Sequence, residues 1–271
     1  MGLVQGNVDQ AIKWDPRSAD AIFQDYVRKT RQAIFEGAQL VIWPESSTPF
    51  MFEEDPVGAE QLRTLVRQAR VNLLFGSDQI ERSAPRKYYN SAFLLRPDGS
   101  VGGVYRKIRL VPFGEYVPFQ RLLFFAAPLT EQVGTFTAGE RAEVLPVNGH
   151  PVSVAICYEV IYPSLVRRFV TAGSELLTTI TNDAWFGDTS APAQHFEQAA
   201  MKPHEQVMSF AVRHSLSIVL ATTGVLWAIV YARSDVNGKA GQVIGNIVSE
   251  WTQILGLVLI TKYARETGSK E

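Results

Sequence analysis

Short apolar runs alternate with helix-period segments along most of this 271-residue chain. The first apolar run covers residues 3–8, and residues 18–38 then place apolar side chains at helical spacing. The next run, QLVIWPE, is rich in branched residues and stops at Pro44, so Glu45 follows the end of a buried strand. This alternation predicts a layered α/β domain whose sheets are covered by helices.

The alternation continues after this strand. Residues 88–107 read as two strands joined by an Asp98-Gly99 turn, and this hairpin predicts a mixed rather than wholly parallel sheet. The other predicted elements are a helix at 58–71, a strand at 72–77, a strand from 150 to Cys157, a helix at 163–173 and a strand running into a polar loop at 174–188.

Charge and composition exclude several classes of function. Lys plus Arg number 26 against 27 for Asp plus Glu, so the net charge of -1 gives no reason to expect a nucleic-acid partner. A single cysteine cannot form an intramolecular disulfide. The four histidines show no metal-ligand spacing, and we predict neither a metal nor a cofactor. These histidines are His150, His195, His204 and His214.

No export or membrane-spanning signal is expected in the chain. The opening residues lack the basic start, apolar stretch and cleavage site of a signal peptide. The weakly polar stretch 217–232 is shorter than the roughly 20 residues of a membrane helix and contains Gly224, so we expect a buried strand or strand pair there. The prediction is one domain over residues 1–271 that is soluble on its own.

Three chemically useful side chains each follow a predicted strand: Glu45, Lys107 and Cys157. Strand ends commonly form the site crevice of α/β sheets. A thiol that attacks a carbonyl needs a base such as a carboxylate, and the resulting oxyanion can be stabilised by a lysine ammonium. Each residue alone also has an ordinary interpretation, as a small buried side chain, a turn residue or a solvated charge.

The sequence motifs around these three residues favour the catalytic interpretation. The strings WPE, YRKIRLVPFGEYVP and CYE occur in this order and together resemble the nitrilase superfamily, whose members use a Glu-Lys-Cys triad on an α-β-β-α sandwich. Over roughly residues 3–201 the chain is similar to the nitrilase-type domain of bacterial apolipoprotein N-acyltransferases. The strings that carry this similarity are VQGNVDQAIKWDP, VIWPESSTPF, KIRLVPFGEYVPF, ICYEVIYP and TNDAWFGDTSAPAQHFEQAAM.

The resemblance implies roles for individual residues. Glu45 would be the general base, Lys107 the oxyanion stabiliser and Cys157 the nucleophile that holds an acyl group as a thioester. Carboxylates near a lysine and a thiol keep the lysine charged and decide which acid holds the proton. For Glu159, the alternative is an ordinary acidic residue at a helix start, where the helix dipole favours it. The residues expected to support the triad are Glu115, Tyr158 and Glu159.

The resemblance also implies a substrate class and a location. These enzymes move a fatty acyl chain from phospholipid to the N-terminal amine of a diacylglyceryl-cysteine lipoprotein, at the periplasmic face of the bacterial inner membrane. An apolar entrance for lipid is expected in residues 117–130, for which a buried core helix is the alternative. The expected substrate-binding residues are Trp43, Phe119, Phe124, Phe125, Trp185 and Phe186.

The resemblance weakens in residues 202–271. Pro203 falls inside an expected helix, and Thr222-Thr223-Gly224 stands where the family has Asn-Thr-Gly, although Asn237-Gly238 still predicts a hairpin turn. The family also has membrane spans on either side of this domain, so we expect an isolated catalytic domain. Two other functions remain open: a soluble carbon-nitrogen hydrolase (amidase) that uses the same triad, and a binding module that has kept only the fold.

Overall fold

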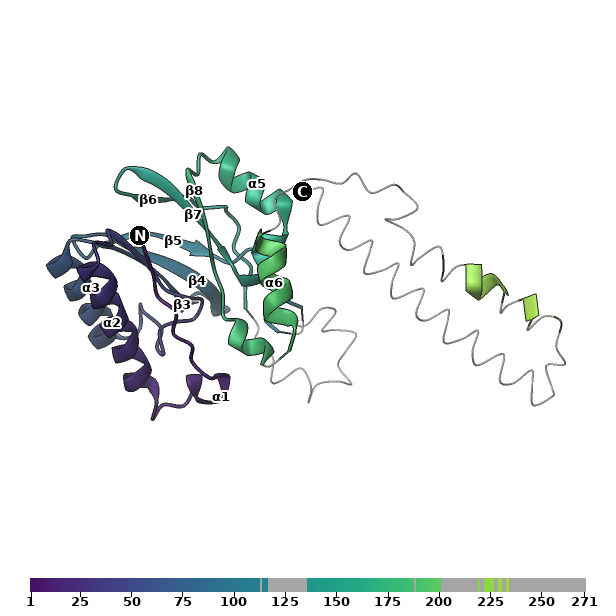
Figure 1. Cartoon of the computed structure of the whole chain (residues 1–271), viewed down its shortest axis with the longest axis horizontal. Coiled ribbons are helices and arrows are strands. Elements are labelled where there is room, and N and C mark those ends of the chain that lie inside the picture. Colours follow the sequence, from purple (N-terminus) through teal and green to yellow (C-terminus); the bar gives the residue numbers. More distant parts are fainter. Residues whose placement is uncertain are drawn as a thin grey trace. The chain divides into compact units, whose positions relative to one another are not determined.

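The computed structural model describes residues 1–112, 114–116, 136–187 and 189–200, and a few positions between 219 and 233. The chain divides into two compact units, Met1–Met201 and Lys202–Glu271. All helices and strands labelled in Figure 1 belong to the first unit. The prediction of a single domain over residues 1–271 stays a prediction.

The larger sheet of the first unit has five strands in the order β1-β2-β3-β4-β5. β1 to β3 run parallel, whereas β3, β4 and β5 pair antiparallel through consecutive hairpins, which confirms the predicted mixed sheet. The predicted Asp98-Gly99 turn joins β4 to β5, and Gly99 there has a φ of 80°. The strands are β1 (Gly2–Leu3), β2 (Leu40–Ile42), β3 (Asn72–Glu81), β4 (Lys87–Leu95) and β5 (Val101–Arg106).

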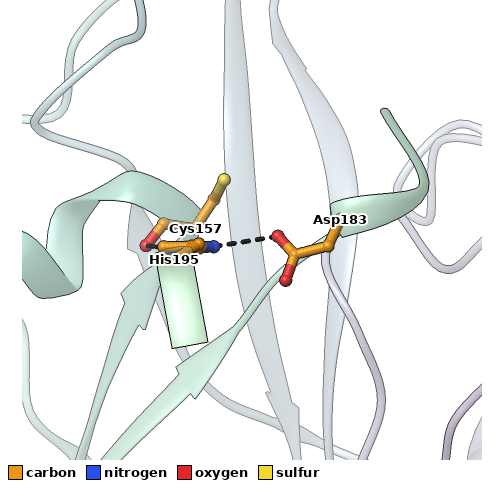
Figure 2. A group of neighbouring side chains, drawn as sticks. All are labelled: Cys157, Asp183 and His195. Atoms are coloured by element: carbon orange, nitrogen blue, oxygen red, sulfur yellow. Dashed lines mark hydrogen bonds and ion pairs between the residues drawn. The ribbon is translucent and has the colours of Figure 1, made fainter. Parts of the chain in front are cut away.

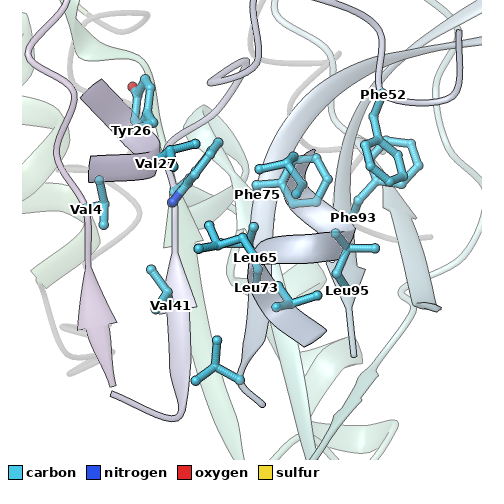
Figure 3. Close-up of a cluster of buried hydrophobic side chains, with 14 of the residues drawn as sticks. Val4, Tyr26, Val27, Val41, Phe52, Leu65, Leu73, Phe75, Phe93 and Leu95 are labelled. Atoms are coloured by element: carbon cyan, nitrogen blue, oxygen red, sulfur yellow. The ribbon is translucent and has the colours of Figure 1, made fainter. Parts of the chain in front are cut away.

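Two amphipathic helices, α2 (Ala19–Phe35) and α3 (Pro56–Ala69), cover one face of this sheet (Figure 1). α3 begins where the Asp55 carboxylate accepts a hydrogen bond from the Gly58 backbone, with proline in the first turn. The layer between helices and sheet is rich in aromatic rings (Figure 3), and full burial of each large apolar side chain stabilises the fold by about 1.5–3 kcal/mol. Members of this cluster include Val4, Tyr26, Val27, Val41, Phe52, Leu65, Leu73, Phe75, Phe93 and Leu95.

A second sheet, in the order β6-β7-β8, packs against the other face of the first. β7 pairs antiparallel with β6 and parallel with β8. Leu74 and Leu94 from the first sheet share one apolar cluster with Val154 and Ile156 from the second, so β3 and β4 are buried on both faces. The strands are β6 (Leu145–Val147), β7 (His150–Ile156) and β8 (Leu176–Ile180), and α5 (Pro163–Thr171) contributes Leu165 and Phe169 to the same cluster.

Short helices follow the strands at the edge where the candidate residues lie. β7 runs directly into the 3-10 helix η2 (Cys157–Ile161), and the end of β8 leads into a second one, η3 (Asp183–Phe186). The helix α6 (Ala191–Ala200) comes next. One further short helix, α1 (Gln10–Lys13), was not predicted; it begins where the Asp9 carboxylate accepts from the backbone of Ala11.

The few described residues of the second unit correct one expectation. Residues 222–226 are helical, although 217–232 were expected to form a buried strand or strand pair, and Val225 and Leu226 are well exposed. An apolar run alone does not distinguish a strand from a helix. In the part of the chain that the structure describes, no helix is long and apolar enough to cross a membrane. The predicted Asn237-Gly238 turn lies outside the described residues.

Candidate active site

Glu45 reaches the site because the chain crosses closely over the neighbouring strand. A Cβ atom at Gly76 would lie 2.6 Å from the Pro44 carbonyl oxygen and 2.7 Å from the Glu45 Cα, so only glycine fits there. The Gly76 backbone N–H donates to the Pro44 carbonyl, and Ser46 then adopts a φ of 45°. This turn buries the Glu45 side chain at the end of β2.

Lys107 follows the last residue of β5 and is fully buried. Its Nζ atom lies 3.2 Å from Glu45 Oε1 and 2.9 Å from Glu115 Oε1. Burial alone would lower the pKa of the ammonium, but the negative charges of the two carboxylates outweigh burial and raise it. The lysine therefore keeps its positive charge at the site, and one cation is shared between two acids.

Asn90, in the middle of β4, completes this cluster and was not predicted. Its Nδ2 donates to Glu45 Oε1 at 2.7 Å and to Glu115 Oε1 at 2.8 Å. The remaining oxygens of the two carboxylates accept backbone N–H groups, from Asn182 for Glu45 and from Val111 for Glu115. Its only sequence signal is a lone amide inside the apolar strand YYNSAFLL, which does not say what the amide contacts.

Cys157 lies at the sharp junction of β7 and η2, with a φ of 54° and little exposed surface. Burial and then the charge of Glu45 raise the pKa of its thiol to about 12, against the lowering effect of Lys107. Hydrogen bonds with the Thr181 side chain and the Tyr158 backbone also lower this pKa, by less than Lys107 does. The thiol is therefore protonated near neutral pH and needs a base at the moment of attack.

Glu159, two residues after the cysteine, is completely buried and crosslinks two parts of the site. Burial raises the pKa of its carboxyl group, and the hydrogen bonds it accepts oppose this rise. It joins the loop after Lys107 to the turn at Cys157, a larger role than that of a helix-start acid. Its donors, at 2.7–2.9 Å, are the backbone N–H groups of Ile108, Arg109 and Ile156 and the hydroxyl of Tyr105.

A histidine and an aspartate flank the cysteine on the side of α6 (Figure 2). His195 is buried; its Nδ1 lies 2.8 Å from Asp183 Oδ1, and its Nε2 lies 3.2 Å from the backbone oxygen of Cys157. The sulfur, a carboxylate oxygen and a ring nitrogen of these three residues lie within 4.8 Å of one another. Both ring nitrogens already have hydrogen-bond partners, which disfavours a bound ion; the absence of a metal stays a prediction.

The structure places the expected substrate-binding residues in different environments. Trp43 has no exposed surface: its ring packs on Tyr26, and its indole N–H donates to Thr30 at 2.7 Å. Trp43 is thus part of the core between helices and sheet, and its contact with substrate stays a prediction. Trp185 is exposed on η3 and Phe186 is half-buried beside it, so both remain available. Phe119, Phe124 and Phe125 lie outside the described residues.

Two further charged groups, Lys13 and Asp78, lie near the Glu45 turn and had no sequence signal. The Lys13 ammonium donates to the Glu45 carbonyl at 3.4 Å, and burial lowers its pKa to about 8 in spite of nearby acids. The Asp78 carboxylate accepts from the Ser46 hydroxyl at 3.3 Å, and burial raises its pKa to about 6. Both groups thus titrate closer to neutrality than such side chains do in water.

Comparison with known proteins gives matches over most of the first unit. Residues 2–205 match the model of the carbon-nitrogen hydrolase family. The chain is 40% identical over 240 residues to the apolipoprotein N-acyltransferase of Geobacter metallireducens, covering 88% of this chain and 44% of that protein. The identity to the apolipoprotein N-acyltransferase of Brucella suis is 36% over 234 residues, covering 82% and 43%.

The chain thus spans less than half the length of the curated relatives it matches. Among solved structures, an amidase of the nitrilase superfamily from Nesterenkonia is similar, with a TM-score of 0.48 and 23% identity over 72% of this chain and 68% of that one.

Proposed function

The chain belongs to the carbon-nitrogen hydrolase family, and from this premise we propose that it is the catalytic domain of an N-acyltransferase. The proposed reaction moves a fatty acyl chain from a phospholipid to the N-terminal amine of a diacylglyceryl-cysteine lipoprotein. The names of the relatives at 40% and 36% identity support this proposal. The predicted nitrilase-type α/β sandwich is confirmed by the family match together with the two packed sheets and their helices.

The observation that carries the proposal is the arrangement of one buried cation between two carboxylates beside a protonated thiol. The charge of Glu45 acts directly on the pKa of the Cys157 thiol, as expected for a base near enough to take its proton. When Glu45 becomes neutral by accepting that proton, Glu115 still holds Lys107 in its charged form. Lys107 can then stabilise an oxyanion.

In the first half-reaction, the thiol proton moves to Glu45 while the sulfur attacks the ester carbonyl of the phospholipid. The carbonyl oxygen becomes an oxyanion that faces Lys107. The ester C–O bond then breaks, and protonated Glu45 gives its proton to the departing lysophospholipid oxygen. The products are a thioester on Cys157 and an ionised Glu45, so protons and charges balance.

In the second half-reaction, the lipoprotein amine attacks the thioester carbonyl and loses a proton to Glu45. The C–S bond breaks, the amide is released, and the proton returns to the sulfur of Cys157. With water in place of the amine, the same steps give the hydrolase that is the alternative function. The acceptor therefore decides between the two functions, and the first half-reaction is common to both.

The partners proposed are a phospholipid donor, an apolipoprotein acceptor and a membrane surface at the periplasmic face of the bacterial inner membrane. The relatives' names support the lipid and lipoprotein partners. Exposed Trp185 and half-buried Phe186, at the end of β8 close to the site, offer apolar surface for an acyl chain.

The test is intact-protein mass spectrometry after incubation with phosphatidylethanolamine vesicles, for the wild type and for Cys157→Ala. We expect a gain of one acyl mass that hydroxylamine removes and that Cys157→Ala abolishes. A parallel incubation with p-nitrophenyl butyrate reports the chemistry without lipid. Labelling by the small ester but not by phospholipid would contradict the lipid donor and favour the hydrolase. No labelling of folded protein by either donor would contradict acyl transfer altogether.

A further inference from the structure

The backbone of Cys157 adopts a conformation that its surroundings must hold. A φ of 54° lies in the left-handed region, which costs a residue with a side chain of the order of 1–2 kcal/mol. On the N-terminal side, Glu159 accepts the N–H of Ile156 and fixes the entry into the turn. The carbonyl of Cys157 itself points to the ring of His195. The steps proposed for acyl transfer give no role to this contact between His195 and the Cys157 carbonyl.

Each of the two ring nitrogens of His195 lies close to an oxygen atom that can accept a hydrogen bond. Nδ1 lies 2.8 Å from the Asp183 carboxylate, and Nε2 lies 3.2 Å from the Cys157 carbonyl oxygen. A backbone carbonyl can only accept, so the contact with Cys157 is a hydrogen bond when Nε2 carries hydrogen. The Asp183 carboxylate on the other nitrogen holds the ring in the orientation that directs Nε2 to the Cys157 carbonyl.

Asp183 is in turn linked to the sulfur side of the cysteine. The Thr181 hydroxyl donates to Asp183 Oδ1 at 2.7 Å, and the same hydroxyl hydrogen-bonds the Cys157 thiol. The titratable groups that face the imidazole are therefore Asp183 from η3 and, from η2, the thiol of Cys157 and the ring of Tyr158. The chain of contacts reaches both the carbonyl and the thiol of the same residue.

We propose that His195 is a positioning residue: oriented by Asp183, it anchors the carbonyl of Cys157 and so fixes the turn that aims the thiol at the substrate carbonyl. This proposal rests on acyl transfer at Cys157. His195 acts through the backbone of the nucleophile and takes no proton in the reaction. A misplacement of about 1 Å in a reacting group slows a reaction by roughly a hundredfold, so the anchor matters for rate.

A matched control exists at the opposite end of the same strand. His150, the first residue of β7, pairs with Glu175 at 2.7 Å, the same chemistry as His195 with Asp183. Its side chain is 74% exposed, and Cys157 lies seven positions further along the extended chain, a span of about 20 Å. Substitution of His150 therefore removes a histidine-carboxylate pair without touching the site.

The experiment compares His195→Gln with His195→Asn. The glutamine amide nitrogen can reach the position of Nε2 and still donate to Cys157, whereas the shorter asparagine reaches only the position of Nδ1. With p-nitrophenyl butyrate as the probe, the burst of nitrophenolate release measures the rate of Cys157 acylation. We expect His195→Asn to slow acylation by at least about tenfold and His195→Gln to restore it to within about threefold of wild type. His150→Asn should match wild type, and thermal unfolding identifies folded variants.

Equal rates for the glutamine and asparagine variants, whether fast or slow, would overturn the proposal, because a merely structural histidine gives no such rescue. If His195→Asn does not fold, Asp183→Asn decides: it replaces the carboxylate that orients the His195 ring with an amide, and we expect acylation several-fold slower. A wild-type rate in Asp183→Asn would overturn the proposal. The small ester labels the cysteine whatever the natural donor is, so failure of phospholipid labelling contradicts the proposed function alone.

Discussion

Two buried acid sites contact the loop that follows β5, and they differ in the donors that hold them. Glu45 and Glu115 share the cation of Lys107 and the amide of Asn90. Among the described residues, Glu159 accepts neutral donors alone, from three backbone N–H groups and one tyrosine hydroxyl. The first site concentrates charge, and the second fixes the backbone.

The difference shows how the same residue type acquires different roles. In the first site the charge can be redistributed, because one carboxylate can gain a proton while the other keeps Lys107 charged. In the second site, protonation of Glu159 weakens hydrogen bonds that hold two chain segments together. We therefore expect substitutions in the first site to lower both the acylation rate and the stability, and those at Glu159 to lower the stability with a smaller effect on the rate.

Removal of the shared cation should have the largest effect. Lys107→Met leaves Glu45 and Glu115 buried as uncompensated like charges, which we expect to lower the free energy of unfolding by about 3–5 kcal/mol. Loss of oxyanion stabilisation should lower the acylation rate of the remaining folded protein by about 10²–10³. Urea unfolding and the p-nitrophenyl butyrate burst measure the two effects.

The control for this substitution is Lys87→Met. Lys87 pairs with Glu81 at 3.6 Å on the exposed part of the same hairpin, so its removal should change the free energy of unfolding by less than about 1 kcal/mol. Acylation by Lys107→Met at a rate close to that of Lys87→Met would show that the buried cation has no part in the chemistry.

Glu159→Gln tests the other side of the comparison. The amide group of glutamine offers one acceptor oxygen where the carboxylate had two, so either Ile156 and Tyr105 or the Ile108 loop lose their acceptor. We expect the free energy of unfolding to fall by about 1–3 kcal/mol. Acylation by the folded fraction should slow less than in Lys107→Met. A larger loss of acylation rate in Glu159→Gln than in Lys107→Met would refute the division between a charged site and a structural one.

The smallest effect is expected at Asp78, behind the charged cluster. Its pKa in the folded protein, about 6, is higher than the value of 3.8 for a free carboxyl, so its stabilising contribution is complete below pH 3.8 and is lost as pH rises through 6. Asp78→Asn should therefore be more stable than wild type by about 1–2 kcal/mol at neutral pH. The gap should close at acid pH. A gap that does not change with pH in urea unfolding would contradict this account.

The sequence predicted the positions of the three central residues, because each follows an apolar run that forms a strand. It also predicted the mixed sheet from the Asp98-Gly99 turn. The burial of Trp43 has a simple physical origin: along β2, residues two apart share a face, and Trp43 continues the core-facing side of Val41. Pro44 then takes the chain off the sheet, and Glu45 leaves that face.

The partners of these residues could not be predicted, since they come from distant parts of the chain. Asn90 lies 45 positions after the carboxylate it contacts, and Asn182 lies 137 positions after it. The crosslinks of Glu159 likewise join segments that only the packing of the two sheets brings together. Periodicity identifies strands and helices, but it carries no information on which strand ends meet.

The central claim is that Glu45 activates a protonated Cys157 thiol, and its most direct test is the pH dependence of Cys157 alkylation by iodoacetamide. Cys157 is the only cysteine in the sequence, so no other thiol competes for the reagent. A thiol with a pKa of about 12 should react at a rate that rises up to about pH 10 without a plateau. Glu45→Gln removes the negative charge that raises this pKa, so it should speed alkylation while it abolishes acylation by p-nitrophenyl butyrate. A plateau below about pH 8, or slower alkylation in Glu45→Gln, would show a preformed thiolate and contradict activation by Glu45.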